Sequence, residues 1–140
     1  MECVADLSFC AGWFQPSQGH EPGTRLLKAH LAGNVTVICP SIWRYEVLNL
    51  LLTAVRRGTL SELQAEDGID LLNVVGVKIE DHHTNLIEKR LYRLSRQYKL
   101  SAYDAAYLEL ADRLQSPLLT RDRDLLAAAK QRNLSVTIPL

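Results

Sequence analysis

Short apolar segments alternate with longer amphipathic ones along most of the chain, and this alternation restricts the possible folds more than any other feature. One short segment, VTVIC at 35–39, is rich in the β-branched residues typical of a buried strand. We expect strands at 2–5, 35–39, 74–79, 117–120 and 135–140. We expect helices at 25–32 and 41–57, from Ser61 onward, and at 81–98, 101–114 and 122–132, with a loop at 15–24. Strands that alternate with helices predict an α/β domain with a mostly parallel sheet.

The size and composition of the chain fit one domain over residues 1–140. Hydrophobic residues make up 47% of the sequence, which is enough to fill one core, and no internal repeat is visible. No apolar run approaches the roughly 20 residues of a membrane-spanning helix, and the N-terminus lacks the pattern of a secretory signal, so we expect a cytoplasmic protein. The three cysteines include no C-x-x-C pair. We interpret Cys3 and Cys39 as thiols of the core.

The charges of the chain balance. Lys and Arg together number 16, as do Asp and Glu, so the formal net charge is zero. This balance excludes a global electrostatic attraction to nucleic acid. It does not exclude a local one, because a bound cation would change the charge of the surface around it.

Two aspartates follow predicted strands. Asp6 comes directly after the strand at 2–5, and Asp122 lies just past the strand at 117–120. Parallel strands present their carboxyl ends at one edge of the sheet, where α/β proteins bind their ligands. We therefore expect these carboxylates to lie near each other, although each could also serve only as the cap of the helix that follows it.

Two further acids occupy apolar faces of predicted helices. Glu46 lies four residues from both Ile42 and Leu50, and Asp104 lies among alanines and leucines at 100–111. An ionised side chain on such a face is costly unless it is paired or binds a metal ion. A salt bridge or a position at the edge of the apolar face would also explain Glu46. A favourable interaction with the helix dipole would also explain Asp104.

Taken together, the four acids predict a metal site. Four neighbouring carboxylates repel one another and raise each other's pKa, so they need a cation. Oxygen ligands without nearby His or Cys favour a hard ion, Mg²⁺ or Mn²⁺. Such ions in carboxylate pockets serve phosphodiester chemistry.

The acids also stand in motifs that resemble those of the PIN-domain ribonucleases, specifically the VapC-type toxins of toxin–antitoxin pairs. The segment VADLS contains Asp6 and Ser8, and PSIWRYEVLNLLL contains Glu46 and Asn49. The most specific segment is LSAYDAAYLELA at 100–111, which contains Asp104. The segment LLTRD supplies Thr120 and Asp122. Their order and spacing agree with the family over nearly the whole chain.

This resemblance implies a three-layer α/β/α domain that cleaves RNA with Mg²⁺, forms a homodimer and is controlled by an antitoxin protein. It implies Asp6, Glu46, Asp104 and Asp122 as the catalytic acids. Asp6, Asp104 and Asp122 would bind the metal, with Glu46 doing so directly or through water, while Ser8, Thr120 and Asn49 would support them. Asp124 is a second candidate beside Asp122, but Asp122 matches the motif spacing and Asp124 is interpreted as a first-turn acid of the next helix.

Several other residues have alternative interpretations. We interpret His82 and His83 as solvated rather than metal ligands, because no third His lies at ligand spacing. Trp13 and Trp43 are interpreted as core or interface residues, and no motif assigns Glu21 of the loop at 15–24 to the site. A basic stretch is interpreted as a solvated helix face, with contact to the RNA backbone as the alternative. It comprises Lys89, Arg90, Arg93, Arg96 and Lys99.

Two other functions compete with that of a ribonuclease. A phosphatase of the haloacid-dehalogenase type would need a second Asp two residues after the nucleophile, and Ser8 stands there. A catalytically inactive PIN-like module for RNA binding or regulation would be marked by loss of the acids, and all four are present. The three consecutive leucines at 50–52 cannot all face one core, so we expect at least one of them to meet another surface, as in a homodimer.

Overall fold

Four short parallel strands form the centre of the computed structural model, which describes residues 1–140. The strands are β1 (Glu2–Ala5), β2 (Thr36–Pro40), β3 (Lys78–Glu80) and β4 (Leu118–Leu119). They are arranged in the order β3-β2-β1-β4, so β1 and β2 are the inner strands. The register places Cys3 beside Val37 and Val4 beside Leu118. The inner strands are apolar throughout their buried parts because both faces of the sheet are covered.

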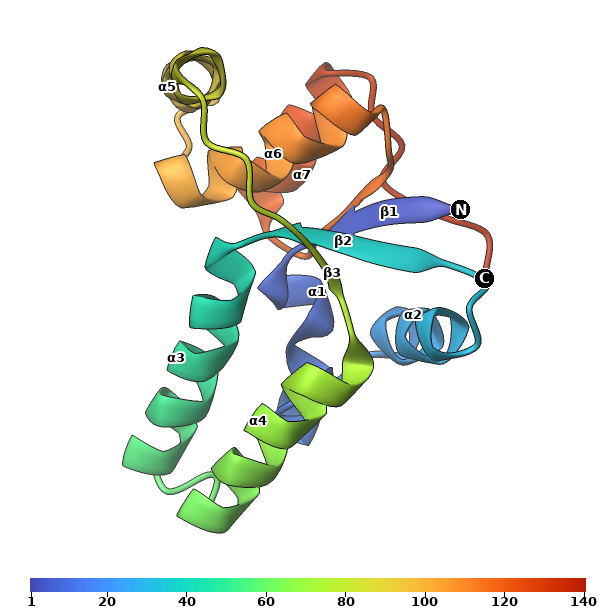
Figure 1. The fold of residues 1–140 in the computed structure, drawn as a ribbon, viewed down its shortest axis with the longest axis vertical. Coiled ribbons are helices and arrows are strands. Elements are labelled where there is room, and N and C mark those ends of the chain that lie inside the picture. The colour runs from blue at the N-terminus through green and yellow to red at the C-terminus, as the bar shows by residue number, and fades with distance from the viewer.

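Helices cover the two faces of the sheet, and the prediction of a three-layer α/β/α domain is confirmed (Figure 1). On one side lie α1 (Leu7–Cys10), α2 (Glu21–Leu31), α3 (Ile42–Arg56) and α4 (Glu62–Val75). On the other side lie α5 (Asn85–Tyr98), α6 (Ala102–Leu114) and α7 (Arg123–Gln131). Two 3-10 turns, Ala11–Trp13 and Pro16–Gln18, connect α1 to α2. No helix has the length and apolar character needed to cross a membrane.

The core contains the residues that the sequence assigned to it. Cys3 and Cys39 are fully buried, as predicted, and burial raises the pKa of the Cys3 thiol to about 12, so this thiol stays protonated. Trp13 and Trp43 are also buried, with Trp43 fully enclosed. Their rings pack edge to face at a centroid distance of 6.5 Å, which confirms a place in the core.

Two predicted boundaries were wrong near the middle of the chain. The expected strand at 74–79 begins only at Lys78, because Val74 and Val75 complete α4. Gly76 follows in the left-handed region, with φ of 66°, and ends the helix there. The helix expected from Asp81 begins at Asn85, where the side chain of Thr84 caps it.

Two further predictions were also wrong. The expected loop at 15–24 contains the turn Pro16–Gln18 and the first residues of α2, which begins at Glu21 with a proline in its first turn. The expected strand at 135–140 does not form. Leu118 N donates one hydrogen bond to Ser135 O, but β4 is only two residues long and offers no continuous ladder to a further strand.

Candidate active site

Asp6 occupies the junction between β1 and α1, close to the centre of the sheet. Its side chain is 5% exposed and accepts hydrogen bonds at both carboxylate oxygens. Ser8 Oγ donates to Oδ1 at 2.6 Å and Phe9 N donates to the same atom at 3.1 Å, so Asp6 is the N-cap of α1. Thr120 Oγ1 donates to Oδ2 at 2.6 Å. Asp6 therefore joins two neighbouring strands through a side-chain contact.

Asp122 stands at the equivalent junction between β4 and α7. Its Oδ1 accepts a hydrogen bond from Leu125 N at 2.9 Å, which makes it the N-cap of α7. Its own backbone N–H donates to Thr120 Oγ1 at 3.0 Å. Thr120 thus contacts both aspartates, and these contacts define where the side chain of Asp6 and the backbone of Asp122 lie.

Glu46 and Asp104 approach from helices on opposite sides of the sheet. Glu46 lies in α3, where it is half-buried and accepts a hydrogen bond from the hydroxyl of Tyr107 in α6. Asp104 lies in the first turn of α6, and its backbone N–H donates to Ser101 Oγ at 3.1 Å. The capping serine sets the start of α6 and therefore the position of Asp104.

The charges of the acids act on neighbouring members of the group, since Asp122 affects Asp6 and Asp104, and both of these affect Glu46. Burial raises the pKa of Asp6, the bonds from Ser8, Thr120 and Phe9 oppose this rise, and the charge of Asp122 adds to it. Burial also raises the pKa of Glu46, where the bond from Tyr107 opposes the rise and the charges of Asp6 and Asp104 increase it. These are the shifts expected for carboxylates that share a partly buried site.

The pKa of Asp104 shows which of the two aspartates at 122 and 124 lies nearer to it. Burial raises its pKa first, and the neighbouring charge of Asp122 raises it next, while the bond with Ser101 lowers it. The charge of Asp124 contributes less than that of Asp122. Asp124 is exposed in the first turn of α7, as interpreted from the sequence. The structure therefore brings Asp6, Glu46, Asp104 and Asp122 together and leaves Asp124 at their margin.

The donor chemistry of this acid cluster, defined as Asp6, Glu46, Asp104 and Asp122, fits a hard cation. All its side-chain ligand atoms are carboxylate oxygens. A cation would offset the repulsion that adds to burial in raising the pKa values of Asp6, Glu46 and Asp104. No three His, Cys, Asp or Glu side chains yet surround one point closely enough to hold a metal ion. Several of these oxygens accept hydrogen bonds instead, from Ser8, Thr120, Tyr107 and the amide of Leu125.

Comparison with known proteins identifies the family of the chain. Residues 3–131 match the PIN domain. The chain belongs to the PIN-domain family. Among similar proteins, ribonuclease VapC3 of Pyrobaculum aerophilum is 30% identical over 125 residues, which cover 89% of this chain and 92% of that protein. Ribonuclease VapC1 of Mycobacterium tuberculosis is 36% identical over 127 residues, which cover 91% of this chain and 90% of that protein.

Solved structures support the PIN-domain fold. PAE2754 from Pyrobaculum aerophilum matches with a TM-score of 0.70 at 21% identity, covering 91% of this chain and 79% of that one. VapBC2 from Rickettsia felis, solved with a DNA fragment from its promoter, matches with a TM-score of 0.66 at 17% identity, covering 98% of both chains. At these identities the likeness establishes the fold of the PIN domain.

The supporting residues of the PIN motifs have different positions in the structure. Ser8 and Thr120 both donate to Asp6, and the backbone N–H of Arg121 donates to Ser8 Oγ at 2.8 Å. Asn49 lies one turn after Glu46 on α3, is exposed, and makes no hydrogen bond to the acids. Its supporting role stays a prediction.

The residues outside the PIN motifs lie away from the acid cluster or on the surface. His82 and His83 are exposed beside Glu80 and Asp81 and precede α5. Glu21 is exposed and pairs with Arg25 within its own helix. The basic stretch lies mostly on the exposed face of α5, and only Arg90 forms a salt bridge, with Asp112. Contact between that face and RNA remains an open alternative.

Sequence reasoning did not single out Tyr107 as part of this PIN site. Its side chain is 1% exposed and its hydroxyl reaches Glu46, sixty-one positions away along the chain. One signal was present: Tyr107 follows Asp104 by three residues, so both lie on one face of α6. A tyrosine among apolar residues is also expected from ordinary core packing. The spacing alone therefore did not distinguish Tyr107 from its neighbours.

Replacing one of the acids is expected to stabilise the PIN domain without metal. Asp104→Asn should raise the melting temperature in EDTA at neutral pH by a few degrees, because it removes a carboxylate whose burial, and whose repulsion by Asp122, disfavour folding. The pKa of Asp104 is raised in the folded state. Its ionisation therefore costs no stability below the ordinary pKa and lowers stability as the pH rises through the folded-state pKa.

The difference in melting temperature between Asp104→Asn and the unchanged protein should accordingly narrow as the pH is lowered. Scanning calorimetry over a pH series measures this trend. Asp67→Asn is the matched control, because Asp67 is an exposed residue of α4 without a salt bridge. Equal effects of the two substitutions at every pH would show that the burial and repulsion of the Asp104 carboxylate do not lower stability.

Proposed function

We infer that this PIN domain is a metal-dependent endoribonuclease that hydrolyses phosphodiester bonds of RNA and acts as the toxin of a type II toxin–antitoxin pair. The observation that carries this proposal is the acid cluster, in which carboxylates from four parts of the chain lie at one end of the sheet, with Thr120 Oγ1 bonded to both Asp6 Oδ2 and Asp122 N and with Glu46 close enough to feel the charges of Asp6 and Asp104. The similarity to ribonucleases VapC3 and VapC1, which extends over about nine-tenths of the chain, supports the same conclusion.

Asp6, Asp104 and Asp122 would hold Mg²⁺ or Mn²⁺, with Glu46 acting directly or through water. When bound, the ion supplies charge neutralisation at the phosphate and activation of a water molecule. The hydroxyls of Ser8 and Thr120 restrict how Asp6 can turn, because they bind its two oxygens separately.

Tyr107 orients Glu46, and Glu46 accepts a proton during the reaction. Tyr107 holds one oxygen of Glu46, so the second oxygen is the one available toward the substrate. A carboxylate with a raised pKa can accept a proton from attacking water near neutral pH, and Glu46 has this property because of burial and the neighbouring acids. The buried position of Asp6 keeps water from competing for its hydrogen bonds.

Metal dependence is the first test of the ribonuclease proposal. The purified protein should cleave RNA in Mg²⁺ or Mn²⁺, lose cleavage in EDTA, and regain it when Mg²⁺ is added in excess. The physical reason is that only a cation offsets the charge of four carboxylates beside a phosphate. Gel analysis of labelled RNA measures cleavage, and full activity in EDTA would refute the metal-dependent mechanism.

The two aspartates of the TRDRD segment are expected to differ in importance. Asp122→Asn should lower kcat more than about a hundredfold, since even partners outside the ligand shell are often worth roughly tenfold to a hundredfold. Asparagine also caps helices, so α7 should keep its start. Asp124→Asn is the matched control, because Asp124 is exposed in the same helical turn.

Kinetics of both variants on one RNA decide this assignment. Activity close to that of the unchanged protein is expected for Asp124→Asn. An inactive Asp124→Asn with an active Asp122→Asn would exchange their roles. Absence of cleavage by the unchanged protein as well would favour the alternative of an inactive PIN-like module that only binds RNA.

The proposal also includes a homodimer that is inhibited by an antitoxin. Of the three consecutive leucines, Leu51 is 2% exposed, whereas Leu52 is 53% exposed on the outer side of α3. The similarity in fold to VapBC2 of Rickettsia felis supports a protein partner. We expect light scattering to give the mass of a dimer at micromolar concentration, and Leu52→Gln to shift the equilibrium toward monomer. A monomer mass at high concentration would exclude the dimer.

A further inference from the structure

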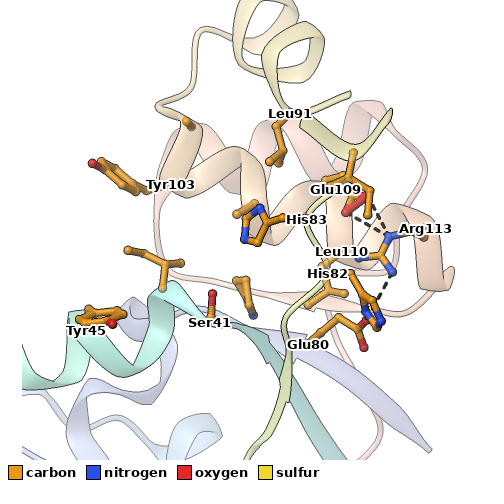
Figure 2. A pocket seen from close by; sticks show the side chains of 15 residues that line it. Ser41, Tyr45, Glu80, His82, His83, Leu91, Tyr103, Glu109, Leu110 and Arg113 are labelled. Atoms are coloured by element: carbon orange, nitrogen blue, oxygen red, sulfur yellow. Dashed lines mark hydrogen bonds and ion pairs between the residues drawn. The ribbon is translucent and has the colours of Figure 1, made fainter. Parts of the chain in front are cut away.

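A cavity of about 300 Å³ opens beside the acid cluster, between the start of α3 and the helices α5 and α6 (Figure 2). Its walls are largely apolar and include Ile42, Leu91 and Leu110. A second, shallower hollow adjoins it and is lined by Glu46 and Asn49. The two hollows share Ile42, Tyr45 and Tyr103 as lining residues, so one continuous surface leads from Glu46 of the acid cluster into the cavity.

Two tyrosine rings stand where the cavity and the hollow meet. Tyr45 is 69% exposed and Tyr103 is 64% exposed. Figure 2 shows both at the same end of the cavity, Tyr45 projecting from α3 and Tyr103 from α6. Neither hydroxyl makes a hydrogen bond within the protein. Two large aromatic faces are therefore exposed to solvent at one opening, where no packing within the chain requires them.

Each of these tyrosines is the neighbour, along the chain, of an acid of the cluster. Tyr45 precedes Glu46 and Tyr103 precedes Asp104. Successive residues of a helix point about 100° apart, so each ring lies on the face next to that of its acid. A molecule held at the acids would therefore extend naturally onto the rings. A second copy of the chain could also cover the rings, but an RNA substrate is the occupant that must also reach the acids.

The charges at the far end of the cavity are already paired within the protein. Arg113 Nε donates to both oxygens of the buried Glu109, at 2.8 and 3.3 Å. Arg113 also lies 3.8 Å from Glu80, which contacts His82. No free cation is left there to attract a phosphate. The cavity thus suits a flat, uncharged group with polar edges, and single-stranded RNA presents such groups as unpaired bases.

We propose that Tyr45 and Tyr103 form a stacking site for an unpaired nucleobase of RNA, with the base lying in the cavity while the adjoining phosphate lies at the acid cluster. This inference rests on the proposed ribonuclease function. Stacking tolerates any base, because every base has an aromatic face. The site therefore favours single-stranded over double-stranded RNA without selecting a sequence by itself.

The test replaces each ring by an apolar side chain without an aromatic face. Tyr45→Leu and Tyr103→Leu should each weaken binding of short single-stranded oligoribonucleotides about fivefold or more, as measured by fluorescence anisotropy with Ca²⁺ in place of Mg²⁺, so that a hard cation still offsets the charge of the acid cluster. In Mg²⁺ the same variants should raise KM by more than they lower kcat. Tyr45→Phe and Tyr103→Phe should retain binding, because they keep the ring. Duplex RNA of the same sequence should bind all variants alike.

Tyr92→Leu is the matched control, because Tyr92 is 65% exposed on α5 and lines neither hollow. Unchanged binding in both Leu variants, or an equal loss in Tyr92→Leu, would overturn the stacking site. The alternative occupant of the cavity is a second copy of this chain, and light scattering tests for it. If the Leu variants lose the mass of a dimer and recover RNA binding at higher protein concentration, the cavity is a dimer contact and the stacking site is overturned.

The two measurements separate this inference from the ribonuclease proposal. Cleavage in Mg²⁺ with unaltered binding by the Leu variants would refute the stacking site alone. Absence of cleavage in Mg²⁺ together with ring-dependent binding in Ca²⁺ would refute the nuclease and support the stacking site on an RNA-binding module. Absence of both cleavage and RNA binding would refute both.

Discussion

The rest of the site depends on the hydrogen bonds that the buried carboxylate of Asp6 accepts. Burying an ionisable group without partners is costly, and here donors from Ser8, Thr120 and the amide of Phe9 offset that cost. These donors come from both neighbouring strand ends, so satisfying one carboxylate also aligns β1 with the segment after β4. The acids around it are then positioned relative to a side chain that has little freedom to move.

The acids of the cluster serve local structure and the site at once. Asp6 and Asp122 cap α1 and α7, and Asp104 lies in the first turn of α6. Caps and first-turn acids are favoured because the start of a helix carries partial positive charge. The same partial charges make it less costly to keep repelling carboxylates near one another. Capping and metal binding are therefore compatible interpretations of these residues.

The site joins the two helical layers across the end of the sheet. Glu46 belongs to α3 on one side and Tyr107 to α6 on the other, and their hydrogen bond passes between the layers. The exposed rings of Tyr45 and Tyr103 come from the same two helices. Any rearrangement of α3 against α6 would thus change the acids and the cavity together, which couples the proposed site of cleavage to the proposed site of base stacking.

The sequence by itself determined the strand and helix alternation, the burial of Cys3 and Cys39, and the strand-end positions of Asp6 and Asp122, because these follow from local patterns and the parallel arrangement of strands. The β-branched residues Val74 and Val75 led to the prediction of a strand, but they complete α4. The segment at 135–140 was also predicted as a strand, but it forms no strand ladder with β4. Only the tertiary structure decided that Tyr107 binds Glu46 and that Tyr45 and Tyr103 share one opening. Contacts between residues so distant in the chain depend on how helices pack across the sheet, and no local pattern encodes that packing.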